Sequence, residues 1–584
     1  MDIKMNSNKI NRIMLGNVAK AFSSMFAMVY LANDDFRTIS IVFYCALVFL
    51  FYSLYSNFSQ TDIRVEKISS RIALLFTIFM FLGNDFLGVC LEKKNIPVVI
   101  TITASTFGLF WLFKVVLSKI YTKWLKWDDK VREEEINNKG NIRKVFWCSF
   151  VLMWSIYFIY FLNQYPGSLS CDTRAQLRQA IGAGDFENMN PLINTLLITL
   201  CVQIGMAIGG SINSGVAVYT LVQFTLAAVI FSYTVSVIYK KRFHKLLVLV
   251  CWSFFALVPH NIVYATGMWK DSFFALFFLL TLVYSWEMIE NGGEIKKYQY
   301  IILGVYSLIA SLARNSGWSS LLAFCIFVFV GARNNKRVLK TAITLFIGVM
   351  GNFLIVSCVY PLFASSASTN VTTAISVPIQ QISRVVTIGC ELTEEEKELI
   401  DKLVDIEKIP ELYDETISDP VKFSINKKNL ENDYSTYVKL WIKLGMKYPK
   451  CYLDAYIALT KSFWYPDSST WKWDTRILEN DYGVYRSPVI LKSKDITNWF
   501  YRMYEFPKGS VFNNHSTILW LIIVCLGYAA IRKNKIGMML FVPILAIYGG
   551  LMFTSPVALF RYTYGAIVCT PLLVCIPYLK TKEN

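Results

Sequence analysis

The sequence predicts an all-α polytopic membrane protein, and three observations support this prediction. Of its 584 residues, 55% are hydrophobic, more than the roughly 45–50% usual in soluble domains. The apolar residues gather in long runs, many of them close to the roughly 20 residues that a helix needs to cross a bilayer. The net charge of +17 resides largely in short segments between these runs, which is typical of membrane topology rather than of nucleic-acid binding.

Fifteen apolar runs can be read along the chain, at 14–32, 38–57, 70–90, 97–118, 144–162, 191–209, 213–238, 245–263, 271–289, 298–313, 317–331, 338–361, 516–531, 536–553 and 559–578. If all of them crossed, the basic KKRFHK segment would share a side with the acidic 163–190 loop, against the cytoplasmic bias of Lys and Arg. We therefore expect 191–209 to enter the outer half of the membrane and return. About fourteen spanning helices and two cytoplasmic termini result, with LEKKN at 91–95 as the exception that falls outside.

The runs divide the chain into four segments. Residues 1–143 hold additional N-terminal transmembrane helices and a cytoplasmic loop, and 144–361 form a transmembrane core with an outer loop at 163–212. Residues 362–515 are expected to be a mainly helical extracytoplasmic domain, and 516–584 form C-terminal transmembrane helices.

Two local features of the 362–515 segment carry specific expectations. TEEEKELIDKLVDI predicts a helix with Thr393 as N-cap and Glu396 completing a capping box. Cys390 and Cys451 could form a disulfide if this segment is extracytoplasmic, but spacing alone leaves their pairing open.

Asp172 is the first candidate for chemistry. It follows an apolar run in the acidic outer loop, where a carboxylate could act as general base toward an acceptor hydroxyl. The alternative is a helix N-cap, since CDTRAQLRQA follows a helical pattern. Asp185 and Glu187, further along the loop, are candidates for contact with substrate or a metal.

Charged residues lie at the edges of two later runs. Lys270 could bind a phosphate and Asp271 could orient it, or the pair could only anchor the span. Arg314-Asn315 stands between two apolar runs with almost no loop, so Arg314 needs an anionic partner. Asp172, Asp271 and a lipid phosphate are the three possibilities.

AISVPIQQISRVV brings Gln380, Gln381 and Arg384 within one helical turn. Their amide and guanidinium donors suit sugar hydroxyls and phosphates, although a polar face turned to water would give the same pattern. Trp464 could stack on a sugar ring or belong to an interfacial aromatic belt.

Arg561-Tyr562 places another charge at the outer edge of the last run. Only three histidines are present, and no metal-ligand spacing is found. No P-loop, GxSxG, HExxH or GxGxxG motif occurs, so nucleotide-driven transport and the common hydrolase schemes have no support.

In order along the chain, YPGSLSCD, NPLINTLL, KDSFFAL, LARNSGW, SVPIQQISR and PVALFRYTYG resemble motifs of the GT-C superfamily of integral-membrane glycosyltransferases. That superfamily includes protein O-mannosyltransferases and lipid A aminoarabinose transferases, and the chain is more closely similar to an uncharacterised bacterial branch. The resemblance covers about 160–580, and the first four spans look like an addition.

The resemblance implies roles for individual residues. Asp172 corresponds to the catalytic base or acceptor-orienting carboxylate, and Lys270 with Asp271 to residues that bind the donor phosphate or a metal. Arg314 and Arg561 correspond to residues that hold the polyprenyl phosphate. The chain has Asn190-Pro191 where relatives tend to have His-Pro, and Asn cannot transfer a proton at that position.

We therefore expect a cell-membrane glycosyltransferase that moves a sugar from a polyprenyl-phosphate carrier to an extracytoplasmic acceptor, which could be a cell-wall polymer, a lipid-linked glycan or a protein. Asp172 would activate the acceptor, while Lys270, Arg314, Arg384 or Arg561 stabilise the departing phosphate. No cofactor is certain beyond the polyprenyl-phosphate sugar as donor substrate, a divalent cation is left open, and no nucleic-acid partner is expected. The alternatives are a lipid-linked glycan polymerase or ligase, and a transporter or flippase of a lipid-linked saccharide.

Overall fold

A computed structural model describes residues 2–31, 41–58, 62–84, 96–133, 141–241, 243–290, 295–331, 334–362, 364, 375–466, 475–490, 496, 499 and 514–578. Within these ranges the chain is helical, with isolated β-bridges in place of strands. LEKKN at 91–95 lies outside the described residues, as do the last six residues.

The chain forms two compact units, Met1–Ile136 with Trp520–Lys535, and Asn137–Leu519 with Ile536–Asn584. The C-terminal helices, expected as one segment, therefore contribute to both. The first unit contains part of α25 (His515–Ile531) and the helices α1 (Asp2–Leu31), α2 (Ile41–Ser56), α3 (Ile63–Gly83) and α5 (Ile96–Glu133). Phe76 of α3 stacks on Trp520 of α25 at 3.9 Å between ring centroids. The N-terminal helices thus form one unit together with part of α25.

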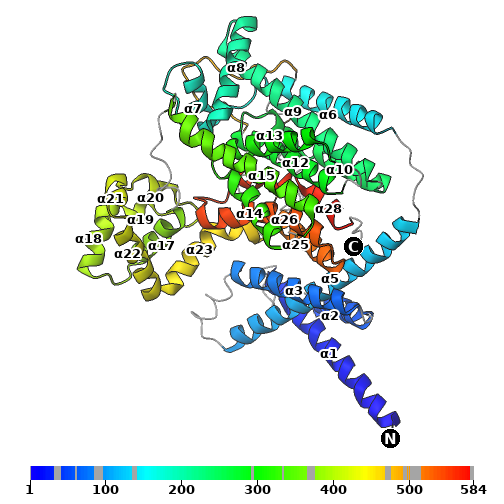
Figure 1. The fold of residues 1–584 in the computed structure, drawn as a ribbon. Helices are drawn as coiled ribbons and strands as arrows, with labels where there is room; N and C mark the ends of the chain where they lie inside the picture. Colours follow the sequence, from blue (N-terminus) through cyan, green and yellow to red (C-terminus); the bar gives the residue numbers. More distant parts are fainter. Residues whose placement is uncertain are drawn as a thin grey trace. The chain divides into compact units, whose positions relative to one another are not determined.

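The second unit contains a group of mainly apolar helices, some long and some short (Figure 1). These elements are α6 (Ile142–Gln164), α7 (Cys171–Ala180), α8 (Leu192–Gly209), α9 (Ile212–Lys240), α10 (Lys245–Leu257), α11 (Pro259–Thr266), α12 (Lys270–Glu290), α13 (Lys297–Leu312), α14 (Gly317–Gly331), α15 (Lys336–Leu354), η1 (Ile355–Val359), η2 (Tyr360–Leu362), α26 (Lys535–Thr554), α27 (Phe560–Ile567), α28 (Thr570–Cys575) and η4 (Ile576–Tyr578). Helix α12 is buried on nearly every side and packs on α9, α13, α15 and α27. Its N-terminus, which carries Lys270 and Asp271, is consequently surrounded by other elements.

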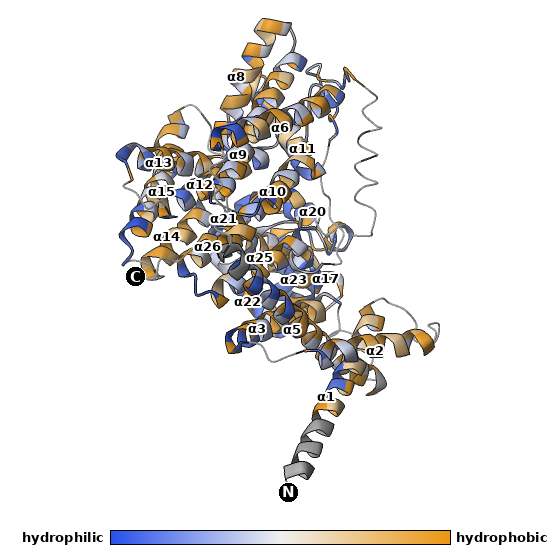
Figure 2. Ribbon diagram, turned by 90° about the vertical axis from the view of Figure 1, so that its right-hand side faces the viewer, coloured by the Kyte–Doolittle hydropathy of each residue, from blue (hydrophilic) through white to orange (hydrophobic). Residues whose placement is uncertain are grey.

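Eight helical segments among the described residues are long and apolar enough to cross a membrane: Ile13–Leu31, Val98–Asp128, Ile142–Gln164, Leu192–Gly209, Ile212–Lys240, Lys270–Glu290, Lys336–Leu362 and Lys535–Thr554. Hydrophobic residues dominate α8, α14 and α26 (Figure 2). Two bent pairs raise the number to ten if each pair is one span, namely Lys245–Leu257 with Pro259–Thr266 and Phe560–Ile567 with Thr570–Tyr578. The chain is therefore a polytopic helical membrane protein.

The expected fourteen spans include helices shorter than a bilayer-crossing segment, such as α14 with 15 residues, α13 with 16 and α25 with 17. Their number stays a prediction. The run expected to re-enter is a single helix, α8, of 18 residues, and it packs on α9 after a tight connection at Gly210 and Ser211.

A group of mostly short helices within the second unit corresponds to the described part of the expected polar domain (Figure 1). Its elements are α17 (Ser376–Thr387), α18 (Glu394–Leu403), α19 (Ile409–Leu412), α20 (Asp419–Phe423), α21 (Lys427–Asn432), α22 (Tyr434–Lys447) and α23 (Pro449–Trp464). They share a hydrophobic core that includes Val385, Ile400 and Leu444. The predicted capping box is confirmed: Glu396 N donates to Thr393 Oγ1 at 3.3 Å, and Thr393 N donates to Glu396 Oε2 at 2.9 Å.

Candidate functional site

Asp172 lies on α7, a ten-residue helix between α6 and α8. Ser170 is the N-cap and Asp172 is the second residue of the helix, so the interpretation of Asp172 as the N-cap is wrong. A carboxylate in the first turn still benefits from the positive end of the helix dipole. Because α7 is too short to cross a bilayer, it holds Asp172 between two candidate spans.

The loop before α7 is fixed by a segment from far along the chain. Leu169 N donates to Arg476 O and Leu478 N donates to Leu169 O, both at 3.0 Å, and Ser487 N donates to Tyr165 O at 3.0 Å. The segment 475–489 thus runs beside the loop and satisfies its backbone groups. Sequence analysis missed this pairing because nothing local to either segment indicates it.

Gly167 in the same loop has a φ of +136°, and a Cβ there would lie 2.3 Å from Thr220 Oγ1. Thr220 Oγ1 donates to Pro166 O at 2.8 Å. The loop therefore approaches α9 closely enough that only glycine fits without a shift.

A chain of buried polar side chains extends from α7 to the loop that precedes α12. Gln176 accepts a hydrogen bond from Asn194 at 3.2 Å. Tyr219 OH lies 2.9 Å from Asn194 Oδ1 and 3.0 Å from Gln223 Oε1. Gln223 in turn donates to Tyr264 O at 3.1 Å and to Gly267 O. Thr173 Oγ1 donates to Met268 O. These contacts fix the backbone just before Lys270.

None of these network residues was a predicted site residue. A usable signal was present, since Asn194, Tyr219 and Gln223 are polar positions inside apolar runs, and buried polar groups need partners.

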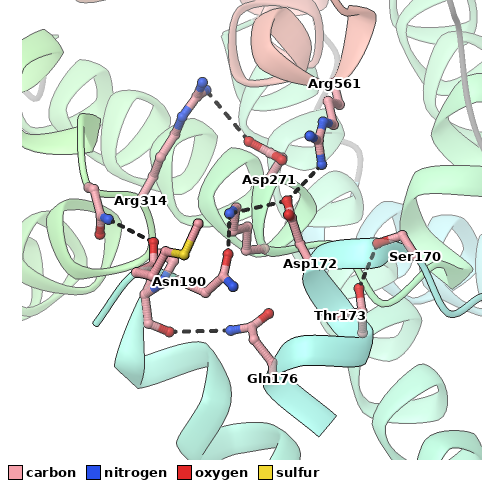
Figure 3. Close-up of polar contacts among 12 residues, drawn as sticks. Ser170, Asp172, Thr173, Gln176, Asn190, Asp271, Arg314 and Arg561 are labelled. Atoms are coloured by element: carbon pink, nitrogen blue, oxygen red, sulfur yellow. Dashed lines mark hydrogen bonds and ion pairs between the residues drawn. The ribbon is translucent and has the colours of Figure 1, made fainter. Parts of the chain in front are cut away.

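The carboxylate of Asp172 and two cationic side chains meet at one atom. Asp172 Oδ2 lies 2.8 Å from Arg561 Nη1 and 3.2 Å from Lys270 Nζ, so α7, α12 and α27 converge there (Figure 3). The side chain of Asp172 is 29% exposed and those of Lys270 and Arg561 are 19% exposed. The three groups therefore remain within reach of a ligand.

Lys270 is oriented by a second oxygen. Its ammonium donates to Asn190 Oδ1, directly before α8. Asn190 thus supplies a neutral acceptor for Lys270 and is itself buried.

Arg314 and Asp271 form a second ion pair next to Asp172 (Figure 3). Arg314 Nη1 lies 3.7 Å from Asp271 Oδ1 and donates to Tyr562 O at 2.8 Å. Of the three anionic partners proposed for Arg314, the structure provides Asp271. Asn315 Nδ2 donates to Met189 O at 3.2 Å, which ties the α13–α14 connection to the residue before Asn190.

Asp271 is a deeply buried carboxylate with few partners. It is 1% exposed, and within the described residues neither of its oxygens accepts a hydrogen bond. A buried anion of this kind is costly unless it is compensated. Its compensation comes from the nearby guanidinium of Arg314 at ion-pair distance.

Aromatic rings hold the two guanidinium groups in place. The Arg561 guanidinium lies 4.9 Å from the ring centroids of both Trp269 and Tyr562, and that of Arg314 lies 5.5 Å from Tyr562 and 5.6 Å from Phe274. These distances fit cation–π contacts.

The charges around Asp172 determine its protonation. Burial acts to raise the pKa of its carboxyl group, but the positive charges of Lys270 and Arg561 and their hydrogen bonds outweigh burial and lower the pKa below its ordinary value. Asp172 is therefore a carboxylate at neutral pH. With Lys270, Arg314 and Arg561 against Asp172 and Asp271, the cluster carries one positive charge in excess.

The donors present do not fit a resident divalent cation. No group of three or more His, Cys, Asp or Glu side chains with metal-binding geometry occurs among the residues that the structure describes. Asp172 and Asp271 each already pair with a cationic side chain.

The structure does not bring Gln380, Gln381 and Arg384 to the cluster around Asp172. They lie on α17, which Figure 1 shows apart from α7. Gln380 donates to Asp414 O, Gln381 accepts from Trp441 Nε1 at 2.7 Å, and Arg384 lies 3.6 Å from Asp454 Oδ2.

Gln380 and Gln381 are buried, so the alternative of a face turned to water is wrong for them. Trp464 is also buried and donates to Thr460 Oγ1 at 3.3 Å within its own helix. Within the described contacts, these side chains serve the helical domain.

An open cleft of about 550 Å³ runs beside α7. Its lining includes Arg174 and Arg178 of α7, Asp185 and Glu187 of the following loop, and Asp481. The two carboxylates proposed for substrate contact thus belong to this cleft rather than to the ion cluster. Cys171, next to Asp172, also lines it, so the cleft reaches the first turn of α7.

Residues 183–584 match the family of unknown function DUF6020, which is more than half of the chain. The chain belongs to the DUF6020 family. The match includes Lys270, Asp271, Arg314 and Arg561 but begins after Asp172. No curated protein and no solved structure matches this DUF6020 chain.

Proposed function

We propose that this DUF6020 protein is a membrane glycosyltransferase that moves a sugar from a polyprenyl-phosphate carrier to an extracytoplasmic acceptor. The observation that carries the proposal is the meeting of Asp172 with Lys270 and Arg561 at one carboxylate oxygen. This contact joins a candidate base, which lies on a short helix between two candidate spans, to two cations that could bind a phosphate. The topology proposed with it has about fourteen spans, cytoplasmic termini and the cluster on the outer side.

The cations suit a phosphate better than a neutral ligand. The cluster has one excess positive charge, and guanidinium groups bind phosphate oxygens through charge-assisted hydrogen bonds. A donor phosphate beside Lys270 and Arg561 would share the cations that now face Asp172. Its negative charge would also raise the pKa of Asp172 and make the carboxylate a better base at the moment the donor is bound.

Transfer then follows from this arrangement as one displacement. Asp172 accepts the proton of the acceptor hydroxyl, the hydroxyl oxygen bonds to the anomeric carbon, and the bond from that carbon to the phosphate oxygen breaks. Lys270 and Arg561 stabilise the charge on the departing phosphate, and Arg314, the third cation of the cluster, adds to this stabilisation. The cleft along α7 is the proposed acceptor side, because it reaches the turn that carries Asp172.

The test is transfer of radiolabelled sugar from a panel of polyprenyl-phosphate monosaccharides by the purified protein, its Asp172→Asn variant and the control Glu431→Gln. Glu431 is an exposed carboxylate on α21. Loss of a positioned general base costs roughly 10²–10⁴-fold in rate, so Asp172→Asn should show this loss while the control keeps parental transfer. Equal rates in all three would remove Asp172 as the base. Transfer of preassembled glycan alone would favour the polymerase or ligase instead.

A further inference from the structure

The thiols of Cys390 and Cys451 lie 3.7 Å apart in the helical domain, and we propose that they form a disulfide in the mature protein. This goes beyond the proposed function, because it needs only that the domain lies on the extracytoplasmic side of the membrane. Both side chains are partly buried and pack against the domain core. A bond requires the sulfurs to approach further, to roughly 2.0 Å.

The backbone on the Cys390 side is fixed by the end of α17. Gly389, with a φ of +77°, donates to Val386 O at 3.0 Å, and Cys390 N donates to Val385 O at 3.1 Å. These two bonds form a Schellman motif, in which glycine adopts the left-handed conformation. Cys390 is therefore held at one defined place after the helix.

The backbone on the Cys451 side is fixed by the start of α23. Pro449 opens this helix and Cys451 lies in its first turn. Gln381 of α17 donates to Tyr452 O at 3.2 Å, next to Cys451, and accepts from Trp441 at 2.7 Å. The contact between α17 and α23 thus holds both cysteines facing each other from rigid elements.

The oxidation is a thiol–disulfide exchange with an extracytoplasmic dithiol oxidase in its disulfide form. One cysteine, as thiolate, attacks a sulfur of that disulfide and forms a mixed disulfide. The second thiolate displaces the oxidase, which leaves as a dithiol and takes up the two electrons and two protons that the cysteines lose.

The bond would close a loop spanning 61 positions that contains α18 to α22. Helices α19, α20 and α21 have only four, five and six residues, too few to be stable by themselves. A crosslink restricts the unfolded chain most when it closes a long loop, so the disulfide would act as a staple for this set of short helices.

Peptide mapping tests the proposal on the full-length protein. Thiols are trapped with N-ethylmaleimide before the cells are opened, and the protein is purified and digested with trypsin without reduction. Cleavage after Arg384, Lys397, Lys450 and Lys461 releases the peptides 385–397 and 451–461, each with one cysteine. The expected result is one species with both peptides joined, which separates on reduction. Both peptides carrying N-ethylmaleimide in the unreduced sample would overturn the proposal.

Two variants sharpen the test. Cys451→Ser should leave Cys390 open to N-ethylmaleimide, whereas Cys171→Ser, at an exposed cysteine on α7, should leave the joined peptides unchanged. An alkylated Cys390 only in Cys451→Ser supports the pairing. A Cys390 equally alkylated in the parent and in both variants contradicts it.

Discussion

Asn190 accepts a hydrogen bond from Lys270 and thereby fixes the ammonium that also lies 3.2 Å from Asp172. The two contacts place Lys270 between a neutral amide and a carboxylate. Asn190 is buried, so Lys270 reaches from the start of α12 into an environment where its charge is poorly screened. The donor phosphate, in the proposed reaction, approaches a cation whose direction is already set.

Substitutions of Asn190 should separate orientation from charge. Asn190→Ala removes the acceptor and should raise the donor KM by about 10-fold, as expected for loss of roughly 1–1.5 kcal/mol in a hydrogen bond. Asn190→Asp keeps the shape but cancels the excess positive charge, so its donor KM should rise further. Steady-state kinetics with varied donor measure both. A donor KM in Asn190→Asp equal to that of the parent would show that the excess charge does not serve donor binding.

Arg561 should be only partly replaceable by lysine. Arg561→Ala removes the ion pair with Asp172 and the contacts with the rings of Trp269 and Tyr562, and should reduce kcat/KM for the donor by roughly 10–100-fold, since hydrogen bonds to charged groups are worth about 1.5–3 kcal/mol. Arg561→Lys keeps the charge but loses the planar fork, so it should recover only part of the loss. Full recovery by lysine would mean that a point charge suffices.

The acid limb of the pH–rate profile should report the cations around Asp172. Its pKa is lowered by Lys270 and Arg561 against burial, so transfer should persist above the depressed pKa and be lost as the pH falls through it. In Lys270→Gln, less positive charge opposes the effect of burial on the pKa of Asp172. That pKa should rise, and the acid limb should move to higher pH. Arg174→Gln is the control, because it also removes one positive charge, from α7, but Arg174 donates to Glu479 O rather than to Asp172. The limb should therefore move less in Arg174→Gln than in Lys270→Gln, and an equal movement would show a non-local charge effect.

Gly167→Ala should destabilise the protein more than Gly210→Ala. Both glycines have positive φ, at +136° and +63°, and a non-glycine residue in such a conformation costs about 1–3 kcal/mol. Only Gly167 also meets a side chain, because a Cβ there would lie 2.3 Å from Thr220 Oγ1, whereas nothing lies within 4 Å at Gly210. The midpoint temperature of thermal unfolding, followed by intrinsic fluorescence, should fall in the order parent, Gly210→Ala, Gly167→Ala. A reversed order would place the close approach elsewhere.

Local patterns in the sequence predicted local structure well. The capping box at Thr393 and Glu396 was predicted because its residues lie within one turn and depend on nothing distant. The membrane class followed from hydropathy, which needs no partner. Within the site, Lys270, Asp271, Arg314 and Arg561 could be singled out because each is a charge at the edge of an apolar run, where a charge needs a partner of opposite sign.

Contacts between distant segments could not be predicted in the same way. Asp271 as partner of Arg314, Asn190 as partner of Lys270 and the pairing of Leu169 with 475–489 all depend on how helices pack, which one sequence does not reveal. Gln380 and Gln381 show the same limit, since their donors are used inside the helical domain.

The pairing of Asp172 with Arg561 joins positions 389 residues apart. During synthesis, the carboxylate of Asp172 leaves the ribosome 389 residues before its guanidinium partner, and several candidate spans are made in between. The loop at Leu169 likewise waits for residue 476. A nascent chain that does not yet include Arg561 thus lacks the charge pair, so the proposed catalytic site can be complete only after α27 has been made.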